Sequence, residues 1–152
     1  MILYNDKDIK RINHTLKVYS FAKNIGSMEQ LSTKQKMTLD LAAILHDIGI
    51  KESEKKYNSA IGKYQEIEGP IVARTILQEY ELDEDLTNRI CYLIGNHHTY
   101  SKIDGLDFQI LIEADFLVNI YEDNMNVDQI TSIKEKFFKT KVGLHYIENM
   151  YL

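Results

Sequence analysis

The sequence lacks the features of a secreted or membrane-spanning protein. Cys91 is the only cysteine, so no internal disulfide can form, and a reducing compartment is the simplest expectation. No run of about 18 apolar residues occurs. The first residues, "MILYNDKDIK", also lack an apolar stretch of signal-peptide length. These absences predict a cytoplasmic protein with no membrane partner.

The chain also has fewer positively charged than negatively charged side chains. The chain has 18 Lys and Arg against 23 Asp and Glu, which gives a formal net charge of −5. A protein that grips a nucleic acid backbone usually carries a basic patch, so no large nucleic acid interface is expected. A small anionic substrate remains compatible with this balance, because a bound metal ion can supply local positive charge.

Proline and glycine, which interrupt helices, are scarce. The single proline and seven glycines fall between periodic segments, and this is typical of an all-α protein. A chain of 152 residues has the length of one domain. We therefore expect residues 1–152 to form a single-domain helical bundle of about six helices. Its core would span about 12–119, followed by a C-terminal helical extension over about 127–152.

The expected helices follow from apolar periodicity and capping residues. They cover about 6–25, 32–46, a third beginning at 69, then 84–98, 106–123 and 127–139. Asp83 is the expected cap of the helix over 84–98, and Asp128 is that of the helix over 127–139. The amphipathic tail 142–152 would dock on the body. The Lys-rich segment 48–65 is expected to be a long loop. The stretch "FQILIEADFLVNIY" has β-branched residues but is too long for a typical strand, so a helix is favoured.

Histidines and aspartates stand at unusual places in these helices. The apolar run "LAAILHDIGI" ends in His46 and Asp47, and "ICYLIGNHH" ends in His97 and His98. Each pair alone has an ordinary explanation, because a histidine at a helix C-terminus is favoured by the helix dipole.

Two further polar residues lie on apolar helix faces. Asp115 is flanked by Leu111, Ile112 and Val118, and a buried carboxylate there must be neutral, paired or bound to a metal. His14 lies in line with apolar residues of the first helix, although it could equally be an ordinary surface or core histidine.

Together these residues suggest one site. Four of the five histidines and two aspartates stand at the ends or apolar faces of four helices, and a helical bundle can bring such positions to one internal point. Imidazole and carboxylate ligands suit Fe, Mn, Co, Ni or Zn, and the lack of a cysteine cluster argues against a closed structural zinc site.

The order His14, His46-Asp47, Asp115 resembles the HD-domain superfamily of metal-dependent phosphohydrolases, whose pattern is H…HD…D on an all-α core. The resemblance covers about Ile12 to Asn119. It implies that these four residues bind a metal ion.

Some members of that superfamily hold a second ion. They share the aspartate as a bridge and add two histidines, the later of which matches His97 or His98. The earlier position is Gln65 in this chain, where Glu66 or Glu68 could substitute as an oxygen ligand. The Gly-Tyr-Pro motif of the cyclic-dinucleotide phosphodiesterases is absent, so that activity is not assigned.

The resemblance implies a metal-dependent phosphohydrolase, a phosphomonoesterase or a phosphodiesterase, that acts on a nucleotide or other small phosphate ester. It would use one or two divalent ions, with Mg²⁺ also considered, and metal-activated water. Asp47 and Lys51 are the catalytic candidates, although Lys51 stands two residues after Gly49 and many relatives have lysine directly after the glycine. Lys51 and Lys102 could hold the anionic substrate, or could simply be solvated surface residues.

Two other interpretations stay open. The chain could be a non-catalytic HD-like module that binds a nucleotide or a metal for regulation, and Gln65 is the residue that favours this alternative. It could also be a plain helical scaffold, which requires the candidate site residues to be coincidental. The C-terminal tail could cover the chain's own core or pair with a second copy to form a homo-oligomer.

Overall fold

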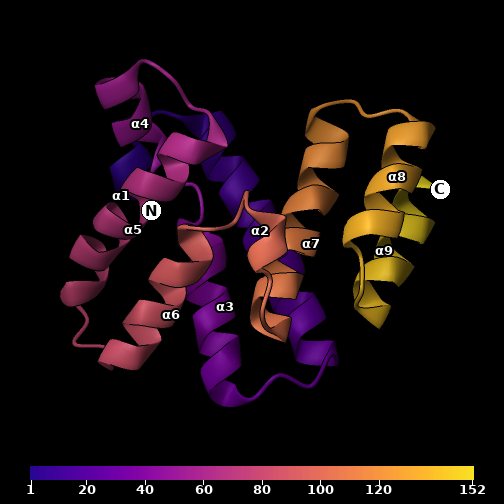
Figure 1. Ribbon diagram of the computed structural model, residues 1–152, viewed down its shortest axis with the longest axis horizontal. Coiled ribbons are helices and arrows are strands. Elements are labelled where there is room, and N and C mark those ends of the chain that lie inside the picture. The colour runs from indigo at the N-terminus through magenta and orange to yellow at the C-terminus, as the bar shows by residue number, and fades with distance from the viewer.

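The chain folds into an all-α bundle, as the sequence predicts. The computed structural model describes residues 1–152 and contains nine α-helices, one short 3-10 helix and no strand (Figure 1). In chain order the elements are α1 (Ile2–Asn5), α2 (Ile9–Met28), α3 (Thr33–Leu45), α4 (Ile50–Tyr57), α5 (Gly62–Gln78), α6 (Glu84–Ile94), η1 (Tyr100–Lys102), α7 (Leu106–Glu122), α8 (Val127–Phe137) and α9 (Lys141–Tyr151).

Three helices, α1, α4 and α9, exceed the expected six, and one of them, α4, lies in the segment 48–65, which is therefore not a loop. It contains α4 and the first turn of α5, and Pro70 lies inside α5 rather than at its start. Ser53 is the only buried residue of α4, and Ile50 and Tyr57 are its only apolar residues, so the segment is polar enough to resemble a loop.

Several helix ends also differ from the expectation, and α6 ends at Ile94 rather than at His98. Helix α2 begins at Ile9 and runs through Gly26 to Met28. A Cβ on Gly26 would lie 2.8 Å from Leu39 Cδ2, the end of a side chain of α3. The cap of α8 is Asn126 rather than Asp128, because the Asn126 side chain accepts from Gln129 N in a capping box.

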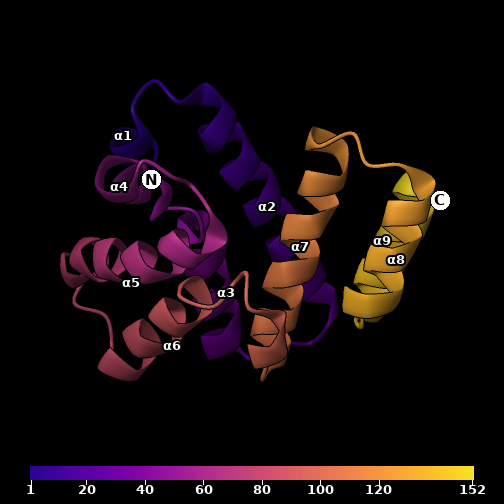
Figure 2. The same ribbon diagram turned by 45° about the horizontal axis from the view of Figure 1, so that its top comes forward.

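Helix α7 is the centre of the bundle. It packs against α2 and α3 on one side and against α8 and α9 on the other, and it has ten buried residues. Figure 2 shows α4 and α5 at one end of the molecule, α2, α3 and α6 in the middle, and the α8–α9 pair covering the far side of α7. The tail docks on the body as expected, and the Tyr151 hydroxyl donates to the Leu117 carbonyl at 2.6 Å.

None of the helices combines the length and the apolar character that crossing a membrane requires.

Candidate metal centre

Five of the predicted ligands converge between α2, α3, α6 and α7. His14 Nε2 lies 3.3 Å from His46 Nε2 and 3.2 Å from Asp115 Oδ1. Asp47 Oδ2 lies 3.6 Å from His14 Nε2 and 3.5 Å from His46 Nε2, and its other oxygen lies 3.6 Å from His97 Nε2. All three histidines are buried, so these groups face one another rather than solvent.

Helix ends orient two of the histidine rings. His46 follows directly after α3, and its Nδ1 lies 2.9 Å from the Ala43 carbonyl oxygen. His97 stands just beyond α6 and places its Nδ1 2.7 Å from the Ile94 carbonyl oxygen. The last carbonyls of a helix have no partner within the helix, so they are free to accept from these rings. A carbonyl oxygen only accepts, so each Nδ1 must carry the proton, and in the neutral ring Nε2 then presents a lone pair to the centre.

The third ring is oriented by a side chain. His14 Nδ1 lies 2.9 Å from Glu122 Oε2. A carboxylate also only accepts, so His14 directs its Nε2 lone pair towards the same centre in its neutral form. When His14 is neutral, three imidazole lone pairs and two carboxylates thus face one point. A cation bound there would replace the proton that His14 Nε2 otherwise shares with Asp115.

This donor set fits a divalent cation. His97 Nε2 is buried and has no hydrogen-bond partner, which is costly unless another group occupies that position. Nitrogen and oxygen ligands of this kind suit Mn, Fe, Co, Ni or Zn. The ligand atoms of His14, His46 and Asp47 lie within 4.8 Å of one another, as do those of Asp47, His97 and His98, so Asp47 belongs to two potential sites.

The local electrostatics favour ionised carboxylates. Burial raises the pKa of Asp47, but the charges of His46, His97 and His14 outweigh burial and hold that pKa well below its usual range. Burial lowers the pKa of His14, yet the hydrogen bond to Asp115 and the nearby carboxylates raise it to about 9. Burial and the charge of His97 lower the pKa of His98 to about 4, so His98 is neutral at physiological pH and can act as a ligand.

The residues around the expected second site are arranged differently from the first. Gln65 Oε1 lies 3.1 Å from His98 Nε2, so Gln65 contacts the ring of a candidate ligand. Glu66 accepts from the His98 backbone N–H and from the Thr99 hydroxyl. Glu68, a predicted ligand, is not brought into either group, because its carboxylate accepts from Lys56 and Tyr57.

The two lysines expected at the substrate make other contacts. Lys51 Nζ donates to the Tyr4 carbonyl at 2.9 Å and lies over the Tyr4 ring. Lys102 Nζ donates to Asn96 Oδ1 at 2.9 Å.

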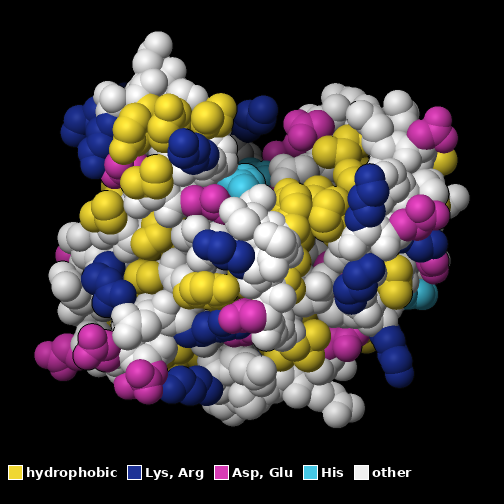
Figure 3. All heavy atoms as spheres, in the orientation of Figure 1, with side chains coloured by type: hydrophobic (Ala, Val, Ile, Leu, Met, Phe, Trp, Pro, Cys, Tyr) yellow, Lys and Arg dark blue, Asp and Glu magenta, His cyan; other side chains and the backbone are white.

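A cavity of about 280 Å³ reaches the centre instead from the N-terminal half of α2. Its lining includes His14 and Asp47 together with Lys10, Arg11 and Asn119. Figure 3 shows a histidine side chain in a hollow between the α4–α5 end of the molecule and α7, with charged side chains on the rim.

Three residues of this region were missed from the sequence although spacing gave a signal for each. Lys10 precedes His14 by four residues, one helical turn, so the two share a face of α2. Arg11 adjoins Lys10 at three residues from His14. Glu122 follows Asp115 by seven residues, two turns along α7.

Comparisons with known proteins identify the family and the fold of this chain. A family model described as HD domain matches residues 11–133. The crystal structure of a predicted HD superfamily hydrolase from an uncultured Thermotogales bacterium superposes with a TM-score of 0.69 at 22% identity. That match covers 97% of this chain and 78% of the other, and it shows a shared fold. Among curated proteins, none matches this chain.

Proposed function

This chain belongs to the HD-domain family, and on that premise we propose that it is a metal-dependent phosphohydrolase acting on a nucleotide or other small phosphate ester. The observation that carries the proposal is the convergence of the Nε2 atoms of His14, His46 and His97 on the carboxylates of Asp47 and Asp115. Such a buried cluster of imidazole and carboxylate ligands is suited to binding a cation, which would displace the proton that His14 shares with Asp115.

The ligands divide into two groups around Asp47. We propose that His14, His46, Asp47 and Asp115 hold one divalent ion, with Fe, Mn, Co, Ni, Zn and Mg as candidates. Asp47, His97 and His98 offer ligands for a second. A divalent ion held there would lower the pKa of a water molecule and polarise a phosphoryl oxygen.

Asp47 is the proposed catalytic residue of the chain. Its Oδ2 faces His14 and His46 while Oδ1 faces His97, so the carboxylate spans both halves of the centre. It is ionised at neutral pH because the surrounding imidazoles stabilise the charge. In this proposal an Asp47 oxygen accepts a hydrogen bond from the attacking water and orients it, and the proton that the water loses passes to the leaving oxygen as its bond to phosphorus breaks.

The cavity indicates a small substrate. Its volume of about 280 Å³ is near the lower end of small-molecule sites. Lys10 lines it and makes no ion pair or side-chain hydrogen bond, whereas Lys51 and Lys102 would have to leave Tyr4 and Asn96 to reach a substrate. Lys10 is therefore the better candidate for the cation that binds the anionic group of the ester.

Elemental analysis and a substrate panel test the proposal. Wild-type protein reconstituted with each candidate metal should retain one or two ions and release phosphate or a nucleotide product from at least one member of a panel of nucleotides and phosphate esters. His46→Ala and Asp47→Ala should lose both metal and activity. His145→Ala is the matched control, because His145 is exposed on α9 and outside the cluster. Wild-type protein without metal above background after reconstitution would contradict the proposal.

A second candidate, a non-catalytic binding module, is favoured by one contact. Gln65 stands where the two-metal pattern has a histidine, and its amide oxygen lies against His98 Nε2. Tight metal retention without turnover anywhere in the panel would support this alternative over the hydrolase.

A further inference from the structure

Glu122 lies outside the H…HD…D pattern but contacts one of its members. Its Oε2 accepts from His14 Nδ1 at 2.9 Å, and its Oε1 accepts from Lys17 Nζ at 2.7 Å. The Glu122 side chain is 13% exposed, so it is largely shielded from solvent. We propose that Glu122 is a positioning residue that fixes the His14 ring for metal binding, and this inference rests on the metal centre of the proposed function.

The need for such a residue follows from where His14 stands. His46 and His97 use free carbonyls at the ends of their own helices, and those acceptors are present whatever the neighbouring side chains are. His14 lies inside α2, where the nearby carbonyls are already occupied by helical hydrogen bonds. A side chain must therefore supply the acceptor for its Nδ1–H, and Glu122 is the side chain that does so.

Two carboxylates of α7 thereby contact the two nitrogens of the His14 ring. Asp115 approaches His14 Nε2 at 3.2 Å, and Glu122, two turns later, holds Nδ1 at 2.9 Å. A carboxylate that accepts from the outer nitrogen of a metal-ligating histidine fixes the tautomer and makes the inner nitrogen a stronger donor. Glu122 therefore affects the quality of His14 as a ligand as well as its direction.

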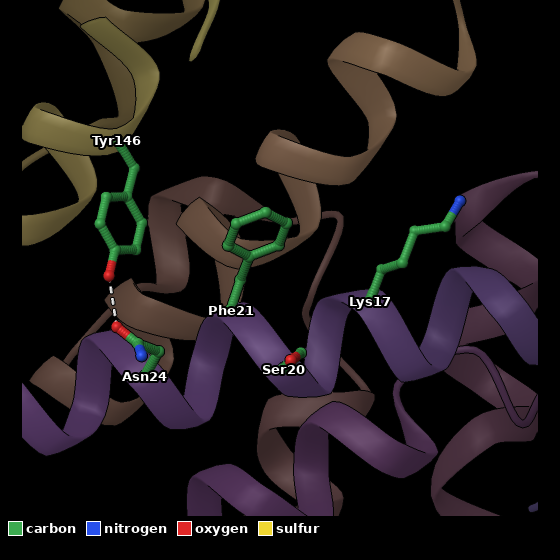
Figure 4. A pocket seen from close by; sticks show the side chains of 5 residues that line it. All are labelled: Lys17, Ser20, Phe21, Asn24 and Tyr146. Carbon is green, nitrogen blue, oxygen red and sulfur yellow. Dashed lines mark hydrogen bonds between the residues drawn. The ribbon is translucent and has the colours of Figure 1, made fainter. Parts of the chain in front are cut away.

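Lys17 holds the second oxygen of Glu122 from the solvent side. It is three residues after His14 on α2, and its side chain is 47% exposed. Lys17 also lines a groove between α2 and α9, at the end away from the hydrogen-bonded Asn24 and Tyr146 (Figure 4). Exposed ion pairs contribute little, so Lys17 should support Glu122 only weakly.

Three substitutions separate orientation from charge. Glu122→Ala removes both the acceptor and the charge. Glu122→Gln keeps an oxygen that can accept from His14 Nδ1, and it removes the charge and the hydrogen bond from Lys17. Lys17→Met leaves Glu122 intact. Glu148→Ala is the matched control, because Glu148 is an exposed glutamate paired with Lys134 on a helix that carries no ligand.

The experiment measures metal binding rather than turnover. The dissociation constant of Co²⁺ is obtained by competition with a chelator, and the visible absorption spectrum of the bound Co²⁺ reports its ligand geometry. Glu122→Ala should weaken binding by about 10- to 100-fold and alter the spectrum. Glu122→Gln should weaken binding less and keep a spectrum close to that of wild type. Lys17→Met and Glu148→Ala should bind as wild type does, within about a factor of three.

Two outcomes overturn different claims. If wild-type protein binds Co²⁺ and folded Glu122→Ala binds it equally well with the same spectrum, the positioning role is wrong while the metal centre stands. If wild-type protein binds no metal, the proposed function fails and the inference falls with it. Should Glu122→Ala not fold, Glu122→Met, which keeps the length of the side chain and removes the acceptor, takes its place, and wild-type Co²⁺ affinity and spectrum in that variant would overturn the positioning role.

Discussion

At the scale of single residues, Gly49 shows how closely the backbone must pack behind the candidate site. It stands two residues after Asp47, and a Cβ at this position would lie 2.5 Å from Gly69 N and 2.6 Å from the Gln65 carbonyl oxygen. Its φ of −75° is open to any residue, so the restriction is steric and comes from the backbone of α5.

Replacing Gly49 by alanine should therefore push α5 away from the turn that carries Asp47. We expect Gly49→Ala to lower the free energy of unfolding by about 1–3 kcal/mol, the range typical of overpacking, in urea denaturation followed by circular dichroism. Metal affinity should fall as well. Gly26→Ala is the control, because its Cβ would meet only the flexible ends of Leu39 and Leu31. Equal stability of the Gly49→Ala and wild-type proteins would show that the two backbones can separate freely.

The candidate ligands were accessible from the sequence, but the backbone acceptors that orient His46 and His97 were not. His46 and Asp47 are conspicuous because they end an apolar run, and Asp115 because its neighbours are apolar. The acceptor of His46 is a backbone carbonyl, which has no sequence signature. Whether Lys10 or Lys51 reaches the cavity depends on how α2 and α4 pack in the folded chain. Local sequence patterns do not predict that packing.

At the scale of helices, Glu113 fastens α8 and α9 to α7. It is fully buried, and its Oε1 accepts from the backbone N–H groups of Lys139 and Thr140 and from Gln109 Nε2. Its Oε2 accepts from the Thr140 hydroxyl. The Glu113 side chain of α7 thus supplies hydrogen-bond acceptors to the backbone at the point where α8 passes into α9.

Removing this acceptor should loosen the α8–α9 pair. Glu113→Ala leaves two backbone N–H groups without partners, and we expect a loss of about 2–4 kcal/mol in unfolding free energy. Glu113→Gln keeps an oxygen at the Oε1 position, so its cost should be nearer about 1 kcal/mol. Chemical denaturation measures both. A Glu113→Gln variant as unstable as Glu113→Ala would mean that the charge, rather than the hydrogen bonds, holds the pair.

The same scale shows why some helices were predicted and others missed. The predicted helix over 106–123 matches α7 almost to the residue, because ten of its side chains are buried and apolar residues surround it. Helix α4 buries only Ser53, and its exposed lysines and glutamates look like those of a loop. Pro70 suggested that a helix begins there, but α5 already begins at Gly62. Buried residues on both sides of Pro70 stabilise the helix by more than the one hydrogen bond that the proline removes.

At the scale of the whole molecule, the candidate ligands connect elements that are far apart in sequence. They come from α2, from the turns after α3 and α6, and from α7, while α8 and α9 supply none. These ligands can bind an ion together only when the four elements are assembled. Its binding free energy is therefore coupled to folding of the bundle.

Metal should accordingly stabilise the chain as a unit. At a free metal concentration 100 times the dissociation constant, the unfolding free energy should rise by about 2.7 kcal/mol. Thermal or urea denaturation with and without metal measures this increase. A chelator should reverse it, and His46→Ala should show no increase.

Amide hydrogen exchange adds a spatial test, since residues of α2, α3, α6 and α7 that exchange by global unfolding should exchange more slowly with metal bound. Residues of α8 and α9 that exchange by local opening should not, because that opening leaves every ligand in place. An equal slowing of local exchange in α9 would mean that the C-terminal pair cannot open without dismantling the centre.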